Sequence, residues 1–256
     1  MNIAYSCSNL TDSQWELLHP MLPAPSKHGR PPIERRLIIN ALLYIAKGGI
    51  QWRLLPNDFP AWQTVYHVFR KWTNDHTWEA LNAQVRASVG KRCRPTASIL
   101  DSQSVKSDPH GGSVGYDAAK RIKGRKRHIL VDTLGLLLGI EVTAAHVPER
   151  DGAKTLLENV LRWCNWLRHM WVDGGYSGPD FAQWVKTQRP KLEVEVVKRS
   201  DDVKGFHVLH RRWVVERTFA WFMRHRRLVR DYETTETSAA AWAYIAMIRI
   251  QLRRLA

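Results

Sequence analysis

Cysteine is scarce in this chain of 256 residues, and long apolar runs are missing from it. The three cysteines, Cys7, Cys93 and Cys164, are widely scattered and form no Cys-x-x-Cys pair, which argues against a disulfide framework and a zinc module. No apolar stretch reaches the roughly 18 residues needed to span a bilayer, and the chain does not open on a secretory signal. We therefore expect a cytoplasmic protein without membrane contact.

Acidic residues are outnumbered by basic ones. The 24 Asp and Glu residues stand against 39 Lys and Arg residues, which leaves a formal net charge of +15. A basic excess of this size indicates a polyanion as partner, and nucleic acid is the simplest candidate. Such a protein would be associated with the nucleoid.

Residues 1–92 have the spacing of short helices. A capping box at residues 11–14 predicts the start of the first helix. Apolar residues three or four apart predict further helices over residues 33–47 and 62–72, and Arg70 and Lys71 lie beside the apolar stripe of the last one. We predict a helix-turn-helix-like DNA-binding domain, with a plain helical bundle as the alternative.

Residues 93–256 alternate between strand and helix patterns, which predicts an α/β domain with a mixed sheet. Strands are expected over residues 96–100, 169–172 and 192–198, and a hairpin over 127–131 and 136–142. Asp132 and Gly135 occupy favourable positions in the hairpin turn, so Asp132 needs no chemical role. Helices are expected over residues 153–166, 181–187, 207–229 and 238–255.

Three carboxylates are candidates for chemistry. Asp101 and Asp173 each follow a short apolar run of strand character, and open α/β sheets carry their chemistry at the carboxyl ends of strands. Glu216 lies one helical turn after Arg212, a spacing that is also typical of an exposed ion pair. Asp173 begins the segment Asp-Gly-Gly-Tyr-Ser-Gly, and the alternative to a chemical role is that this segment is an ordinary turn after a strand. If the three converge, a Mg²⁺ or Mn²⁺ ion would offset their repulsion.

The densest basic run precedes the predicted hairpin. It suggests phosphate contacts along a DNA path, and the alternative is a solvated charge run. Further arginines follow Glu216, among them Arg224. The predicted DNA-binding side chains in these two regions are Lys120, Arg121, Lys123, Arg125, Lys126, Arg127, Arg212 and Arg224.

The chain resembles bacterial insertion-sequence transposases of the DDE type, most closely the insertion sequence 5 family, over nearly its full length. The segments that carry the resemblance are Gly-Arg-Pro-Pro at 29–32, Gln-Trp-Arg-Leu-Leu-Pro at 51–56, Trp-Gln-Thr-Val-Tyr at 62–66, Leu-Asp-Ser-Gln-Ser-Val-Lys at 100–106, Gly-Arg-Lys-Arg-His at 124–128, Asp-Gly-Gly-Tyr at 173–176 and Trp-Val-Val-Glu-Arg-Thr-Phe at 213–219. Together these segments are highly specific, although each alone is weak.

This resemblance implies an RNase H-like catalytic fold in which Asp101, Asp173 and Glu216 bind two Mg²⁺ or Mn²⁺ ions. It implies binding to double-stranded DNA, cleavage at the terminal inverted repeats of the element, and transfer of the exposed 3′ hydroxyl into target DNA. Because both ends must be handled together, we expect a homodimer or a DNA-bridged oligomer. A DNA-binding repressor that no longer cuts, and a nuclease without strand transfer, are the competing interpretations.

The sequence departs from the related pattern at two positions. Leu209 and Met223 stand where that pattern has a Tyr and a Lys, and Arg224 is the expected substitute for the Lys. The short interval between Asp173 and Glu216 leaves no room for the large inserted β domain of some relatives.

Overall fold

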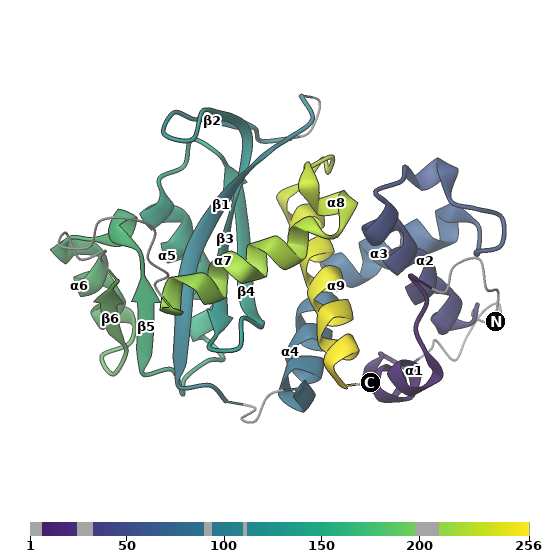
Figure 1. Ribbon diagram of the computed structural model, residues 1–256, viewed down its shortest axis with the longest axis horizontal. Helices are drawn as coiled ribbons and strands as arrows, with labels where there is room; N and C mark the ends of the chain where they lie inside the picture. The colour runs from purple at the N-terminus through teal and green to yellow at the C-terminus, as the bar shows by residue number, and fades with distance from the viewer. Residues whose placement is uncertain (1–6, 25–32, 90–93, 110–111, 198–209, 256) are drawn as a thin grey trace.

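Helices form the N-terminal part of the molecule (Figure 1). The computed structural model describes residues 7–24, 33–89, 94–109, 112–197 and 210–255. The helices before the sheet are α1 (Asp12–Leu18), α2 (Arg35–Gly48), α3 (Trp62–Asn74) and α4 (Thr77–Val89), with 3₁₀ turns at His19–Met21 and Trp52–Leu54. The three predicted helices are confirmed, and α4 is a further helix that the sequence analysis missed.

Local chemistry accounts for the ends of the first helices. The Thr11 side chain accepts from the Gln14 N–H at 3.2 Å, and the Gln14 side chain accepts from the Thr11 N–H, so the capping box is formed. Gly49 ends α2 with φ at +71°, a left-handed conformation that glycine adopts without steric cost.

The sheet follows the helical part of the chain. Its six described strands are β1 (Ala97–Lys106), β2 (Gly115–Asp117), β3 (Ile122–Asp132), β4 (Leu137–Ala144), β5 (His169–Val172) and β6 (Glu193–Val196). They lie in the order β2-β3-β1-β5-β6, and β4 pairs with β3. The β3–β4 pair is the predicted hairpin, whose turn is held by Asp132 Oδ1 accepting from the Leu134 and Leu136 N–H groups. The predicted mixed α/β fold is confirmed.

Two strands are longer than predicted. β1 continues to Lys106 because it pairs antiparallel with β3 from Ser98↔Asp132 to Lys106↔Gly124. β3 already begins at Ile122, so the basic run from Lys123 onward lies inside a strand, and only Lys120 and Arg121 lie in front of it. Asp101 therefore lies within β1, and its predicted place at the end of a strand is wrong.

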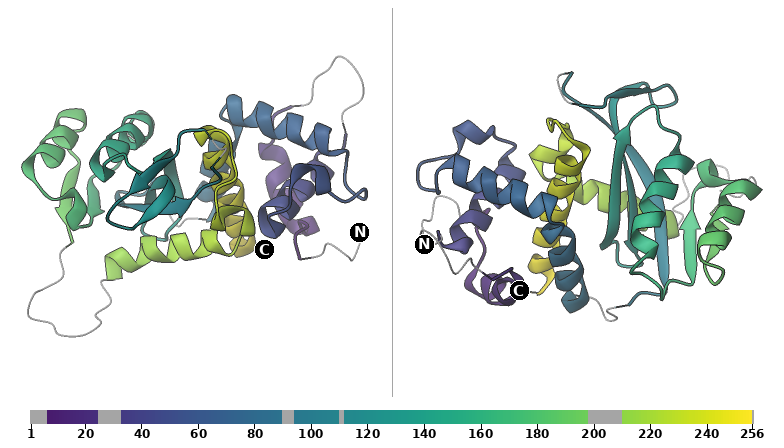
Figure 2. Two further views of the ribbon diagram at one scale, coloured as in Figure 1. Left: turned by 90° about the horizontal axis from the view of Figure 1, so that it is seen from above. Right: turned by 180° about the vertical axis from the view of Figure 1, so that it is seen from behind.

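Helices cover both faces of the sheet, as Figure 2 shows. α7 (His210–Met223) crosses one face against β1, and α5 (Glu149–Leu161) packs on the other against β3 and β4. α6 (Pro179–Gln188) packs beside β6. The single helix predicted over residues 207–229 is instead two, α7 and α8 (Arg226–Val229), because His225 adopts an extended conformation between them.

The C-terminal helix α9 (Glu236–Leu255) lies beside α4, and together they separate helices α1 to α3 from the sheet (Figure 1). Trp242 on α9 packs against Trp52 and Phe69, at centroid distances of 5.6 and 4.8 Å. One apolar cluster thus joins residues from both sides of residue 92, and a second fills the space between the sheet, α5 and α6. The division into domains 1–92 and 93–256 remains a prediction. No described helix is long and apolar enough to cross a membrane.

Candidate active site

Two of the predicted carboxylates lie level with each other on neighbouring parallel strands. β1 pairs with β5 from Ala97↔His169 to Ile99↔Trp171, and continuing this register by two residues brings Asp101 beside Asp173. Asp173 directly follows β5 and caps the 3₁₀ turn Gly174–Tyr176, where its Oδ1 accepts from the Gly175 N–H at 2.9 Å. The sheet thus brings together two acids that are 72 residues apart in the chain.

The environment of Asp101 penalises its negative charge. Burial, together with the neighbouring carboxylates of Asp173 and Glu149, raises the pKa of Asp101 to about 7. The Ser102 N–H, which donates to Asp101 Oδ1 at 2.7 Å, and the Arg212 guanidinium oppose this effect. A cation bound between these carboxylates would lower the electrostatic cost of holding them ionised together.

The third predicted carboxylate comes from α7, which packs on β1 and β5. Arg212 Nη2 lies 3.8 Å from Asp173 Oδ2 and 3.8 Å from Glu216 Oε1. The guanidinium therefore links the two acids, while the side chain of Glu216 is 56% exposed. The structure thus places Arg212 between Asp173 and Glu216.

The side chains of Asp101, Asp173 and Glu216 have the chemistry to bind a divalent metal ion, although they are not arranged around a common ion position. No three His, Cys, Asp or Glu side chains within the described ranges are grouped closely enough to hold an ion. Asp101 and Asp173 interact electrostatically, and Glu216 is connected to them through Arg212. Carboxylate oxygens are the ligands that hard divalent ions prefer, and Arg212 shows that positive charge is favourable between Asp173 and Glu216.

Glu149, in the first turn of α5, is a fourth acid that the sequence analysis missed. Its Oε1 accepts from Ser102 Oγ at 2.8 Å and from Lys120 Nζ at 3.0 Å. Burial raises the pKa of Glu149, but these two hydrogen bonds and the charges of Lys120 and Lys126 outweigh burial and lower it overall. Glu149 is thus held as a carboxylate next to the residue that follows Asp101.

The loop after Asp173 is also fixed from α5. A Cβ on Gly175 would lie 2.6 Å from Glu149 Oε2, so any larger residue there would displace the Glu149 carboxylate. Arg150 Nε donates to the Gly175 carbonyl at 3.1 Å, and its Nη2 donates to the Ser177 carbonyl. The predicted helix began at residue 153, four residues too late, which explains why this pair was overlooked. The run Glu149-Arg150-Asp151, with acids in the first helical turn, was the available signal.

Three residues of the basic run are buried, contrary to the prediction that they contact DNA. Arg125 Nη1 lies 3.2 Å from Asp231 Oδ2 and donates to the Glu233 carbonyl at 2.8 Å. Lys126 Nζ donates to the Val147 carbonyl, and Arg127 Nη1 donates to the Leu228 carbonyl. Because β3 lies inside the sheet under α5 and the segments around α8, these cations are structural.

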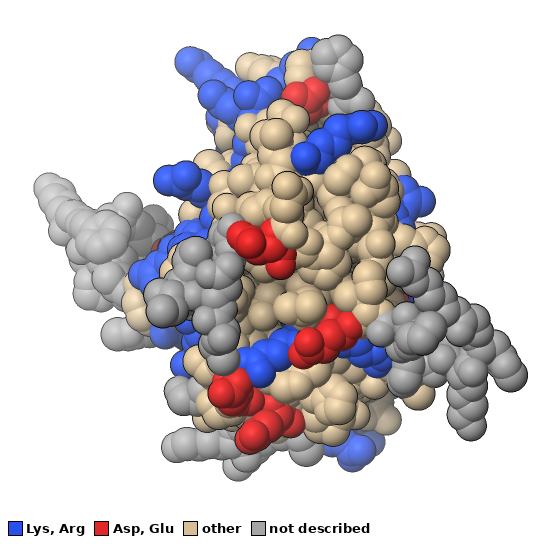
Figure 3. Space-filling view, turned by 90° about the vertical axis from the view of Figure 1, so that its right-hand side faces the viewer, with Lys and Arg blue, Asp and Glu red and all other residues tan. Residues whose placement is uncertain are grey.

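The other predicted DNA-binding residues are open to solvent in different degrees. Arg212 is partly buried, and the remaining ones are exposed: Lys120, Arg121, Lys123, Arg70, Lys71 and Arg224. The face that the N-terminal helices present is not uniformly basic, since Lys and Arg lie mainly along its margin and several acids lie nearer its middle (Figure 3).

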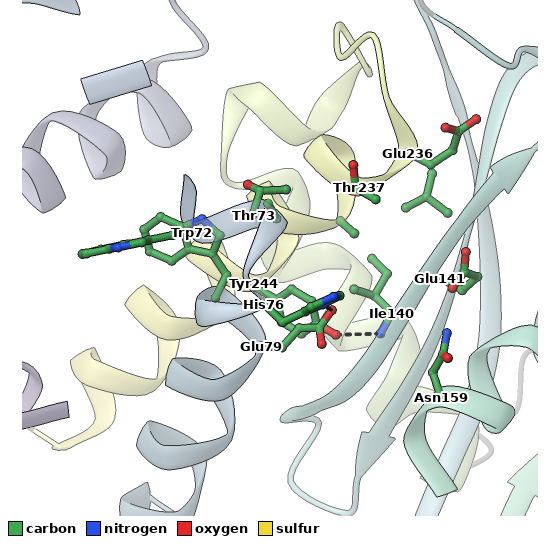
Figure 4. A pocket seen from close by; sticks show the side chains of 14 residues that line it. Trp72, Thr73, His76, Glu79, Ile140, Glu141, Asn159, Glu236, Thr237 and Tyr244 are labelled. Carbon is green, nitrogen blue, oxygen red and sulfur yellow. Dashed lines mark hydrogen bonds and ion pairs between the residues drawn. The ribbon is translucent and has the colours of Figure 1, made fainter. Parts of the chain in front are cut away.

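A separate acidic cavity lies away from these residues. It measures about 180 Å³, and Glu79, Glu141 and Glu236 line it (Figure 4). Burial, with the charges of Glu79 and Glu236, raises the pKa of Glu141 to about 7. The Tyr244 hydroxyl accepts from the Ile140 N–H there at 3.4 Å. The cavity includes none of the three predicted catalytic carboxylates.

Comparison with known proteins assigns both parts of the chain to transposases. Residues 92–250 match the model of the transposase DDE domain, and residues 10–82 match that of a putative transposase of the IS4/5 family. The chain is 26% identical to an uncharacterized 16.2 kDa protein of insertion element IS402 from Burkholderia cepacia over 115 residues, 41% of this chain and 78% of that protein. It is 27% identical to the uncharacterized protein y4sN of Sinorhizobium fredii (strain NBRC 101917 / NGR234) over 119 residues, 46% of this chain and 88% of that protein.

The transposase DDE domain is RNase H-like, in agreement with the mixed sheet and its covering helices, and DDE domains use divalent metal ions. The matched region covers more than half of the chain and contains Asp101, Asp173 and Glu216. The chain therefore belongs to the DDE transposases of the IS4/5 type.

Proposed function

We propose that this transposase binds the terminal inverted repeats of an insertion sequence, cleaves DNA at those ends and joins the freed 3′ hydroxyl to target DNA. The observation that supports this most is the placing of Asp101 level with Asp173 across β1 and β5, with Arg212 and Glu216 above them on α7. A largely buried Asp101 beside a partly exposed Asp173, under a helix that carries Arg212, suits a phosphodiester substrate with bound cations.

The reaction consists of two displacements at phosphorus. In the first, water attacks the phosphodiester at the end of the element, which leaves a 3′ hydroxyl on the element. In the second, that hydroxyl attacks a phosphodiester of the target, forms the new strand bond and releases the target's 3′ hydroxyl. Divalent ions, proposed to be two Mg²⁺ or Mn²⁺, supply activation of the attacking oxygen and stabilisation of the leaving oxygen.

The residues of the chain have separate tasks in this scheme. Asp101, Asp173 and Glu216 would hold the ions. Arg212, which lies between two of these acids, is placed to neutralise negative charge on the phosphoryl group when they bind metal instead. Glu149 and Arg150 orient Ser102 and the loop after Asp173, and so act as positioning residues.

The test uses the full-length protein, a duplex carrying the inverted repeat found beside the gene, and a supercoiled target plasmid. With Mg²⁺ we expect nicks at the repeat end and a joined product. Cleavage without joining would favour a nuclease, and sequence-preferring binding without cleavage would favour a repressor. We propose that two protomers act on two ends together, so that joining of both ends in one product depends on a DNA-bridged dimer. The same DNA partner would place the protein at the nucleoid.

Glu149→Gln is expected to lower the cleavage rate about 10- to 100-fold, because residues that orient metal ligands typically have effects of this size. The amide keeps an acceptor for Ser102 but loses the charge that pairs with Lys120. Single-turnover cleavage at saturating DNA measures this effect, and we expect duplex affinity to stay near that of the wild type.

Glu158→Gln, an exposed change on the same helix, is the matched control and should cleave normally. Glu149→Asp should recover part of the rate, which a purely structural role would not explain. An unchanged rate for Glu149→Gln would remove this residue from the site.

A further inference from the structure

A second cluster of basic residues lies where the ends of α2, α7 and α9 meet. It lines a cavity of about 240 Å³, and its five cations are Lys47, Arg224, Arg249, Arg253 and Arg254. No acidic side chain is among the described residues that line the cavity. We call this group the cationic cavity.

The cations of this cavity repel one another. Burial is the main cause that lowers the pKa of Lys47, and Arg249, Arg253 and Arg224 lower it further. Burial and the charge of Arg253 also lower the pKa of Arg249. So much unneutralised positive charge in a partly buried site indicates a place for an anion.

One hydrogen-bond donor in the cavity has no acceptor. Arg249 is only 6% exposed, and its Nη2 donates to the Cys7 carbonyl. Its Nη1 is buried and finds no hydrogen-bond partner among the described residues. A buried guanidinium N–H without an acceptor is costly, and an anion oxygen entering the cavity would supply one.

The neighbouring cations are held in place before any ligand arrives. Lys47 Nζ donates to the Arg224 carbonyl at 3.0 Å, and the Arg254 guanidinium stacks on the Trp221 ring at 4.3 Å. Arg217 lies between the rings of Trp213 and Trp221, at 4.6 and 4.7 Å. Such contacts reduce the side-chain entropy lost on binding a ligand.

α7 runs from the face of the sheet to α8 and α9 (Figure 1). Because Glu216 and Trp221 both lie on α7, this helix connects the proposed active site to the cavity. Glu216 lies on the helix, and Arg224 follows directly after its last residue. Eight residues at about 1.5 Å each span roughly 12 Å along the helix axis. The phosphates of one DNA strand rise about 3.4 Å each along the duplex, so a strand that follows α7 reaches the cavity about three to four nucleotides from the reacting phosphate.

We propose that the cationic cavity binds a backbone phosphate of the DNA strand that leads away from the reacting bond. This proposal relies on the proposed function for its choice of DNA as the polyanion. It assigns the DNA path to the ends of α2, α7 and α9, and not to the basic run of β3, where Arg125, Lys126 and Arg127 are buried.

The test compares two triple variants of the full-length protein. Lys47→Gln, Arg224→Gln and Arg253→Gln together change exposed cations of the cavity and leave Arg249 in place. The matched control, Arg162→Gln, Lys186→Gln and Lys191→Gln, removes the same charge from exposed positions beyond α5 and on or after α6. Affinity for a random-sequence duplex is measured over a salt series in EDTA, so that the result does not depend on whether the protein cleaves DNA.

We expect the cavity variant to reduce the slope of log affinity against log salt by about one, because one phosphate contact is lost. The control should change the slope by less than about half a unit. Equal slopes for the two variants would overturn the proposal even if cleavage is confirmed. If inorganic phosphate raises the thermal midpoint of the wild type alone while the DNA slopes stay equal, the cavity binds a free anion and the assignment to DNA is wrong.

Discussion

Asp101→Asn, Asp173→Asn and Glu216→Gln should each reduce Mg²⁺-dependent cleavage of terminal-repeat DNA by about 10³-fold or more. Each change keeps the size of the side chain but removes a charge that would bind metal. Bound metal contributes several kcal/mol of transition-state stabilisation, and ~4 kcal/mol corresponds to about 10³-fold in rate. Single-turnover cleavage measures the loss, and filter binding should show an affinity close to that of the wild type.

The controls for these variants must be carboxylates without structural contacts. Asp180→Asn on α6 and Glu158→Gln on α5 are exposed and should cleave at the normal rate. Asp132 is unsuitable, because it is buried and its carboxylate holds the hairpin turn through two N–H groups. Substantial cleavage by one of the three variants would exclude that residue from the proposed site.

The position of Asp173 directly after a strand could be predicted, because strand patterns and the edges of α/β sheets are local and general features. The register of β1 with β5, continued by two residues, places Asp101 beside Asp173. What the sequence did not reveal is how far β1 extends beyond Asp101. Its extension to Lys106 depends on β3, whose residues lie about 20 to 30 positions later. Strand length therefore follows from a partner and not from the strand's own residues.

The helices followed local rules more closely. Thr11 begins a helix through its own side chain, and Gly49 ends one through its own backbone conformation. Both helix ends could therefore be predicted from the sequence. The break between α7 and α8 at His225 could not be predicted from the sequence, because the residues from α7 to α8 include no proline or glycine. At this break, Leu228 packs into the core and Arg227 donates to Glu233. Both contacts belong to the tertiary structure and not to the local sequence.

The basic run was misread for an electrostatic reason. Charged residues are almost never fully buried unless they are paired, so a sequence of six cations at residues 120–127 suggested a solvent-facing segment. The partners of Arg125 are Asp231 and the carbonyls of Glu233 and Thr234, more than 100 residues away. Without those partners in view, burial of this run could not be inferred.

Arg125→Ala is therefore expected to destabilise the fold, lowering the free energy of unfolding by about 3–5 kcal/mol. The substitution leaves Asp231, which is 2% exposed, buried without its guanidinium, and it removes the donors to the Ser113, Glu233 and Thr234 carbonyls. Equilibrium unfolding in urea, followed by tryptophan fluorescence and circular dichroism, measures the change.

Two further variants separate a structural role of Arg125 from a DNA contact. Lys123→Ala, on the same strand but exposed, should change the free energy of unfolding by less than about 0.5 kcal/mol. Arg125→Met combined with Asp231→Leu should recover stability relative to Arg125→Ala, because a buried ion pair can be replaced by apolar side chains whereas half of one cannot. A stable Arg125→Ala protein with weakened duplex binding would contradict the structural role and return this arginine to the DNA path.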